Sequence, residues 1–337
     1  MTVPDFEFAT AGRIMAGPGR AQELPEVLAG LGSRVLVVTG ADPARHGGLL
    51  AGLGLAAAVF PVAAEPTVEL AQAAVGAARR HGADVIAAIG GGSVIDTGKA
   101  VAMLLGNGGD PLDYLVVVGS GRRITQPSVP CVAVPTTAGT GAEVTANAVL
   151  AVPSHRVKAS LRSPLMIPRV ALVDPLLTVS CPPSVTAASG LDALTQCLEP
   201  FVSIRANPLT DGLAGVIGGA ADVPHGMACA ALLAPVIEAN VRALRLEPAE
   251  PRAVGVLDRY TEAARMLTGR PAASIEDGLT WIRETLTLLH VPGLATFGLE
   301  PRQADDIAAK ALTSSSMKGN PVPLSHADLK AILLQAL

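Results

Sequence analysis

A glycine-rich stretch in the N-terminal half has the composition of a phosphate-binding turn. "GGGSVIDTGKA" (90–100) places Gly91, Gly92 and Ser93 between an apolar run and a helical pattern. Glycines let backbone amides approach an anion closely, and the positive end of the helix dipole attracts it. The stretch matches neither the Walker pattern nor GxGxxG, so a tight strand-to-helix turn without a ligand is the alternative. Asp96 falls in the first turn of that helix, where it could face a ligand or only favour the dipole.

A second stretch, "VPTTAGTGAEVT" (134–145), combines hydroxyls with small residues before an expected helical start. Thr136, Thr137 and Thr140 are suited to contact a phosphate, a ribose or a carboxamide. Two such loops at the ends of adjacent strands suggest a dinucleotide. Lys158, in "RVKAS", is either a surface charge or a ribose contact, and Arg162 either holds an anionic substrate group or forms a structural ion pair.

The elements that must position these loops alternate between strand and helix. Continuous apolar runs predict strands that are covered on both faces, as in a parallel sheet. Beyond residue 178 the strand signals fade and the spacing becomes helical. We therefore predict an α/β domain over residues 1–179 and an all-helical domain over residues 180–337. The predicted strands lie within 34–40, 57–62, 84–93, 131–144 and 169–178, and the predicted helices within 21–32, 67–82, 94–107, 183–203, 226–244, 257–269, 275–290 and 300–316.

Composition excludes several classes of protein. The net charge of −4 argues against a nucleic-acid partner, which needs a clustered basic face. No uncharged apolar run is long enough to span a membrane, and the N-terminus lacks the pattern of a signal peptide. The four cysteines show no CxxC spacing, which is typical of reduced, buried thiols. We expect a cytoplasmic protein that associates with neither membranes nor nucleic acids.

Four motifs occur in an order that resembles the iron-containing (group III) alcohol dehydrogenases. They are "GGGSVIDTGKA", "PTTAGTGAEVT", "ALVDP" (171–175) and "SGLDALTQCLEPFVS" (189–203), and "NPLTD" and "VPHG" follow them. The resemblance runs from about residue 6 to the C-terminus. It implies a dinucleotide-binding domain, a helical domain, and hydride transfer between NAD(P) and a small alcohol or aldehyde. A glycerol dehydrogenase-like or dehydroquinate synthase-like relative, or an inactive dinucleotide-binding homologue, is the alternative.

The same resemblance implies roles in cofactor binding. Gly91, Gly92 and Ser93 match the pyrophosphate loop, and Asp96 matches an acid near the nicotinamide. The family often has an Asp after its first strand, where it receives the adenosine 2′-hydroxyl, but this chain has Gly40, with Asp42 two residues on. The preference between NAD and NADP stays open for this reason. The other cofactor-binding residues that we expect are Thr136, Thr137, Thr140, Lys158 and Leu172.

The family's divalent metal, Fe²⁺ or alternatively Zn²⁺, usually takes one Asp and three His. Asp192 matches the Asp, Gln196 stands where the first His is expected four residues later, and His225 in "VPHG" matches the last His. The resemblance implies that the metal polarises the substrate oxygen. Asp192 and His225 are thus the catalytic candidates, and Gln196 is a weaker, neutral ligand.

The remaining His belongs to a helical segment of some forty to fifty residues, before "VPHG" in the family, that this sequence lacks. Either the chain has lost that segment, or the protein carries further residues near Leu213–Val216 that the sequence omits. We favour the second explanation, because deleting two buried helices would expose apolar surface. We also expect a homodimer.

Overall fold

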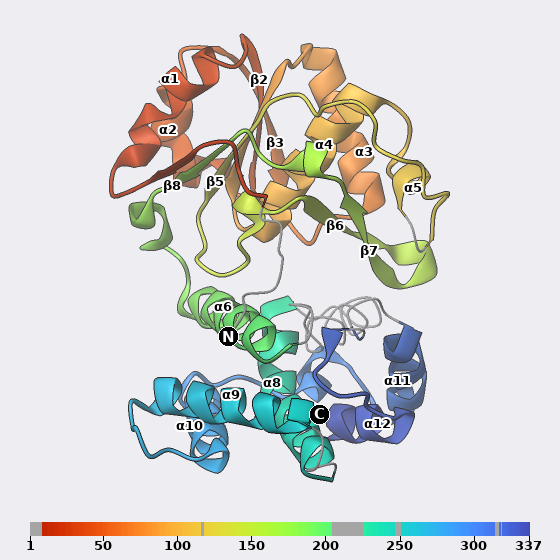
Figure 1. Cartoon of the computed structure of the whole chain (residues 1–337). Helices are drawn as coiled ribbons and strands as arrows, with labels where there is room; N and C mark the ends of the chain where they lie inside the picture. The colour runs from red at the N-terminus through yellow and green to blue at the C-terminus, as the bar shows by residue number, and fades with distance from the viewer. Residues whose placement is uncertain (1–8, 116–117, 204–224, 247–250, 314–316, 318) are drawn as a thin grey trace. The chain divides into compact units, whose positions relative to one another are not determined.

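A computed structural model describes residues 9–115, 118–203, 225–246, 251–313, 317 and 319–337 (Figure 1). The chain divides into two compact units, Met1–Pro182 and Pro183–Leu337. The predicted division after residue 179 lies close to this boundary. The place where further residues were expected, Leu213–Val216, lies outside the described residues.

The first unit contains the predicted parallel sheet, and every neighbouring pair of strands in it is parallel. Strands β2, β4 and β5 are apolar along almost their whole length because both of their faces are covered. In spatial order the strands are β1 (Ile14–Ala16), β8 (Val170–Val173), β5 (Cys131–Pro135), β4 (Val85–Gly90), β2 (Arg34–Gly40) and β3 (Ala56–Val62).

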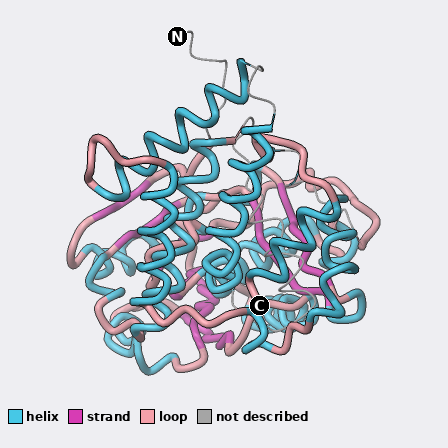
Figure 2. The backbone as a smooth tube through the Cα atoms, turned by 90° about the horizontal axis from the view of Figure 1, so that it is seen from below, coloured by secondary structure: helices cyan, strands magenta, loops and turns pink. Residues whose placement is uncertain are grey.

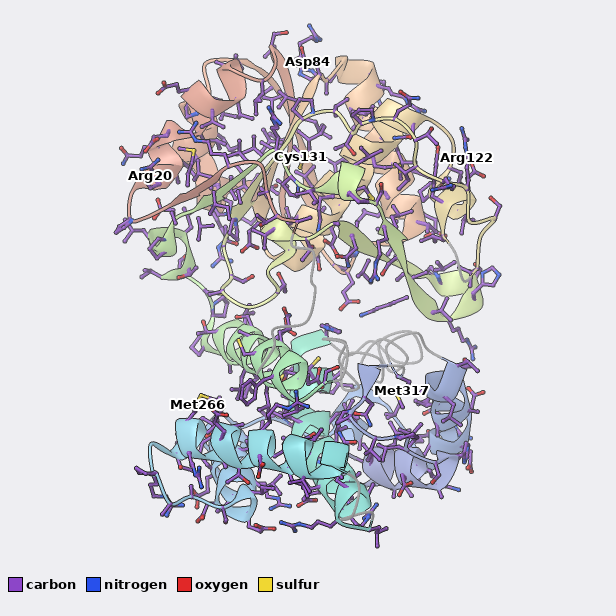
Figure 3. All side chains as sticks on the ribbon, viewed as in Figure 1. Arg20, Asp84, Arg122, Cys131, Met266 and Met317 are labelled. Atoms are coloured by element: carbon purple, nitrogen blue, oxygen red, sulfur yellow. The ribbon has the colours of Figure 1, made fainter. Side chains whose placement is uncertain are left out.

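Helices cover both faces of the sheet, with α1 (Leu24–Ala29) and α2 (Gly47–Ala51) on one side and α3 (Val68–His81) and α4 (Gly92–Asn107) on the other (Figure 1). Alternate residues of each strand enter the two cores: Val37 packs on the α1 side and Val38 on the α4 side. Cys131 lies inside this unit (Figure 3), and burial raises the pKa of its thiol to about 12.

The segment after Gly141 corrects the prediction of a helical start. It forms a single 3-10 turn, Ala142–Val144, and then an antiparallel hairpin of β6 (Asn147–Val152) and β7 (Val157–Arg162). The cause is visible in "NAVLAV", whose apolar side chains alternate between buried and half-buried positions with the period of a strand. The hairpin packs against α3 and α4, and Lys158 lies on its second strand.

Asp174, in the "ALVDP" motif, joins the end of β8 to the segment after β1. Its carboxylate is 3% exposed and accepts hydrogen bonds from the backbone amides of Gly19, Ala21 and Leu176 at 3.0–3.1 Å. Burial raises the pKa of Asp174, but the three amide donors together lower it by more, so the pKa lies below its usual value.

We predict that Asp174→Asn lowers the free energy of unfolding by about 2 kcal/mol at pH 7. A carboxylate with a depressed folded-state pKa contributes stability above its unfolded pKa of 3.8 and loses it as the pH falls through the folded value. The difference from wild type should therefore shrink below pH 3.8. Urea unfolding, followed by circular dichroism at pH 7 and at a pH below 3.8, measures this difference in the free energy of unfolding. Asp42→Asn, at an exposed cap, is the control and should cost under about 1 kcal/mol. An unchanged difference at low pH would contradict the assignment.

The described part of the second unit is helical, as predicted (Figure 2). Of its helices, α8 is apolar and long enough to cross a membrane by length and composition, yet 67% of its most apolar window is buried, as in the core helix of a globular domain. Sequence analysis did not predict the last helix. The helices are α6 (Pro183–Val202), α8 (His225–Leu246), α9 (Pro251–Thr268), α10 (Ile275–Leu288), α11 (Ala304–Thr313) and α12 (His326–Gln335).

Candidate functional site

The two predicted cofactor loops lie side by side at the carboxyl ends of β4 and β5, which are neighbours in the sheet. The amide of Thr136 donates to the carbonyl of Gly90 at 3.0 Å. A Cβ added at Gly92 would lie 2.9 Å from Cγ2 of Thr140, and one at Gly91 would lie 3.3 Å from Cγ2 of Thr137. Gly92 is therefore needed for the contact between the loops, and Gly91 leaves little room for a side chain, whether or not an anion binds.

The start of α4 has the features of an anion site. Its N-cap is Gly91, and no side chain caps the helix. The amides of Gly92 and Ser93, the first two of the helix, have no acceptor within the helix itself. A phosphate placed there would accept from these amides and meet the positive end of the 16-residue helix.

Lys99 is a buried residue of this region that sequence analysis missed. It is 0% exposed, and its Nζ contacts Oδ1 of Asp96 at 2.9 Å. The same Nζ donates to the carbonyl of Ala142 at 2.8 Å and to the hydroxyl of Thr145 at 3.0 Å. Lys99 thus joins α4 to the end of the second cofactor loop. The signal in the sequence was a lysine at i+3 from an aspartate on an otherwise apolar helix.

Asp96 is held on both oxygens by the protein. Oδ2 accepts from the amide of Val149 on β6 at 2.9 Å, while Oδ1 contacts Lys99. These contacts give Asp96 a structural role in fixing the hairpin to α4. Its expected place near the nicotinamide stays a prediction.

The structure places the other predicted cofactor residues as follows. Lys158 is largely buried and forms an ion pair with Glu65. Asp42 caps a 3-10 turn by accepting from the amide of Ala44 at 3.0 Å. Gly40 ends β2, and a Cβ added there meets no atom within 4 Å. Leu172 is 0% exposed inside the sheet, so we assign its side chain to the core and do not include it among the proposed cofactor contacts.

In the second unit, three side chains of types that can bind a metal gather between α6 and α8. Nε2 of His225 lies 4.0 Å from Oδ1 of Asp192 and 3.7 Å from Sγ of Cys229. One ligand atom from each of the three lies within 4.8 Å of the others. Asp192 and Cys229 are 2% and 1% exposed, whereas the His225 side chain is 35% exposed. Asp192 and His225, the two predicted ligands, thus lie close together with a thiol beside them, and their role as ligands stays a prediction.

The close approach of α6 and α8 brings these groups together. A Cβ added at Gly226 would lie 2.4 Å from the carbonyl oxygen of Ala188, so only glycine fits where the two helices meet. The glycine of the motif therefore has a direct structural reason. His225 is the first described residue of α8.

Cys229 is the ligand candidate that sequence analysis missed. It follows His225 by four residues, one helical turn, and residues at i and i+4 share a helix face. That spacing was present in "HGMAC", but the cysteines had been assigned to the core as a group. Gln196, four residues after Asp192 on α6, is exposed, and the structure does not test it as a ligand.

The three donors are of types that bind divalent metals, and two of their three separations are close to those of a zinc site. In a tetrahedral zinc site, bonds of about 2.0 Å to nitrogen and about 2.3 Å to sulfur place the two donors about 3.5 Å apart. The observed nitrogen–sulfur separation is 3.7 Å. The nitrogen–oxygen separation of 4.0 Å exceeds the corresponding value of about 3.3 Å by less than an ångström. Carboxylate, imidazole and thiolate are all ordinary ligands of such an ion.

Two family models match the chain. The model for iron-containing alcohol dehydrogenase covers residues 11–175, and the model for the C-terminal region of the Fe-containing alcohol dehydrogenase family covers residues 213–337. Together they cover most of the first unit and the C-terminal part of the second.

Individual proteins also resemble this chain. The chain is 42% identical over 153 residues to long-chain-alcohol dehydrogenase 1 of Geobacillus thermodenitrificans, in a match that covers 45% of this chain and 38% of the relative. It is 28% identical to choline dehydrogenase of Bacillus subtilis, over 95% of this chain and 92% of the relative. The crystal structure of sulfoacetaldehyde reductase from Bifidobacterium kashiwanohense in complex with NAD+ superposes with a TM-score of 0.78 at 25% identity, covering 99% of each chain.

Several of these matches cover only part of the relative. The chain spans between 38% and 55% of the length of the first four curated relatives that it matches. The match to the choline dehydrogenase runs over 382 positions, more than the 337 residues of this chain, so that relative has residues without a counterpart here. The motifs, the fold and both family models nevertheless agree, and the chain belongs to the iron-containing alcohol dehydrogenase family.

Proposed function

We propose that this protein is a metal-dependent, NAD(P)-linked alcohol dehydrogenase or aldehyde reductase. The observation that carries the proposal is the cluster of Asp192, His225 and Cys229, whose ligand atoms lie within 4.8 Å of one another in a member of this family. The reaction class is hydride transfer between the nicotinamide and the carbon of a small alcohol or aldehyde.

Asp192 and His225 are the residues that we propose to hold the metal. The buried carboxylate of Asp192 supplies the negative charge that favours a cation in a desolvated place. The half-exposed imidazole of His225 supplies a neutral nitrogen on the solvent side of the cluster. A divalent ion held there supplies Lewis-acid polarisation of the substrate oxygen. Gln196 stays a candidate further donor.

The cofactor is proposed to lie over the start of α4. The amides of Gly92 and Ser93 would hold the pyrophosphate, and the hydroxyls of Thr136, Thr137 and Thr140 would contact the rest of the dinucleotide. Lys158, paired with Glu65, would lie on the ribose side. The NAD+ complex of the sulfoacetaldehyde reductase supports a dinucleotide in this fold.

We predict that NADPH is accepted alongside NADH, and that Gly40→Asp shifts the ratio of kcat/KM toward NADH by about 10–100-fold. A carboxylate after β2 would repel a 2′-phosphate and accept from a 2′-hydroxyl. The open space around Gly40 accommodates the side chain. Gly40→Asn, which has the same shape without the charge, is the matched control and should leave the ratio within about threefold of wild type. Equal ratios in all three proteins would show that the ribose lies elsewhere.

The substrate is proposed to be a small aldehyde, and an anionic one is included because a solved relative reduces sulfoacetaldehyde. Four free thiols support a reducing compartment, so we propose a cytoplasmic enzyme, and we expect a homodimer. The test is the oxidation of NADH and NADPH by metal-loaded protein against neutral and anionic aldehydes. Light scattering measures the oligomeric state. Turnover of no aldehyde with any metal would instead favour an inactive dinucleotide-binding homologue.

A further inference from the structure

The fold of α8 places Cys229 beside the two other candidate ligands, Asp192 and His225. The thiol lies one helical turn after His225, so both side chains leave the same face of the helix. The close packing allowed by Gly226 then presses this face against α6, where Asp192 is buried. The helix positions of Cys229 and Gly226 thus place the thiol near Asp192.

A thiol changes what kind of ion the cluster prefers. The ligand set implied by the family resemblance, one Asp and three His, contains only nitrogen and oxygen. Thiolate is a soft ligand that selects zinc and similar ions, whereas carboxylate and imidazole alone suit several divalent metals. Three protein ligands with one open position are also the usual composition of a catalytic zinc site.

From this arrangement we infer that Cys229 is the third protein ligand of the metal site and that this chain takes Zn²⁺ in preference to Fe²⁺. On binding, the thiol of Cys229 releases its proton to solvent as the metal–sulfur bond forms, while Asp192 and His225 bind as carboxylate and neutral imidazole. The inference rests on the proposed function only in taking the Asp192 cluster as the metal site. It needs no residues beyond those of the 337-residue chain.

The first test is X-ray absorption at the zinc edge of the full chain loaded with Zn²⁺. The expected result is one sulfur scatterer at about 2.3 Å together with nitrogen or oxygen at about 2.0–2.1 Å. A shell of nitrogen and oxygen alone would overturn the inference. Because this measurement uses the wild-type protein, it does not depend on whether any variant folds.

The second test uses Co²⁺ as a spectroscopic probe in matched cysteine variants. Wild type and Cys197→Ser should both show the near-ultraviolet charge-transfer band of a cobalt–thiolate bond, since Cys197 is an exposed thiol on α6. Cys229→Ser should lose the band and bind Zn²⁺ at least about 100-fold more weakly, with a smaller preference over Fe²⁺. Retention of the band in Cys229→Ser would contradict the assignment.

These readouts separate the ligand assignment from the enzyme activity. If the protein binds Zn²⁺ through sulfur and reduces no aldehyde, the proposed function is wrong and the role of Cys229 stands. If metal-loaded protein reduces aldehydes with a shell free of sulfur, the proposed function stands and the inference is wrong.

Discussion

Asp192→Asn should lower kcat/KM for aldehyde reduction by about 10³-fold and abolish tight binding of the divalent metal. The substitution keeps the shape of the side chain but removes the only anionic oxygen of the three-residue cluster. Lewis-acid activation by a metal supplies several kcal/mol of transition-state stabilisation, and each 1.36 kcal/mol is worth about tenfold in rate. Steady-state kinetics and metal analysis of the same preparations measure both effects.

The control for this change is Asp258→Asn, which removes the same charge from an exposed position on α9 in the same unit. It should leave kcat/KM and metal content within about twofold of wild type, because an exposed charge is well screened. Circular dichroism shows whether Asp192→Asn keeps its helices. If that variant is folded, binds metal as wild type does and turns over normally, the proposed metal site is wrong.

Lys99→Met should lower the free energy of unfolding of the first unit by about 3–5 kcal/mol. Methionine fills the space of the lysine stem, but it leaves Asp96, whose side chain is 15% exposed, without its cation. It also removes the donor that joins the carbonyl of Ala142 and the hydroxyl of Thr145 to α4. The second cofactor loop should therefore be held less firmly, and the KM for the dinucleotide should rise as well.

Alkylation of Cys131 gives a measurement confined to the first unit. This thiol is 3% exposed and reacts only when the sheet opens, so its labelling against urea concentration follows that unit alone. The double variant Asp96→Asn/Lys99→Met should recover part of the loss, because no unpaired carboxylate remains. Equal urea midpoints for wild type and Lys99→Met would show that the ion pair does not stabilise the sheet domain.

Much of the fold could be predicted because the spacing of apolar residues along the sequence indicates which residues are buried. The apolar run at 34–40 became β2, and the amphipathic run at 67–82 became α3, which begins at Val68 and ends before Gly82 in the left-handed conformation. The hairpin of β6 and β7 was missed because it follows a glycine-rich turn, where a helical start was expected. The alternation in 147–152 was the stronger signal.

The candidate metal ligands came from the family resemblance and not from periodicity. A resemblance carries over residue by residue, so it pointed to Asp192 and His225, and the structure brings the two together at 4.0 Å. It could not point to Cys229, which has no place in the expected set of ligands. It could not predict Lys99 either, because the role of a buried lysine depends on which carbonyls and carboxylates its Nζ reaches.

The most direct test of the account is a metal titration of the wild-type protein after removal of bound metal with a chelator. Bound Zn²⁺ and the rate of NADH oxidation with an aldehyde are measured on the same samples. The account predicts negligible activity in the stripped protein and a rate that rises in proportion to bound metal, saturating at one ion per chain. Full activity in the stripped protein, or one bound ion per chain without any activity, would contradict it.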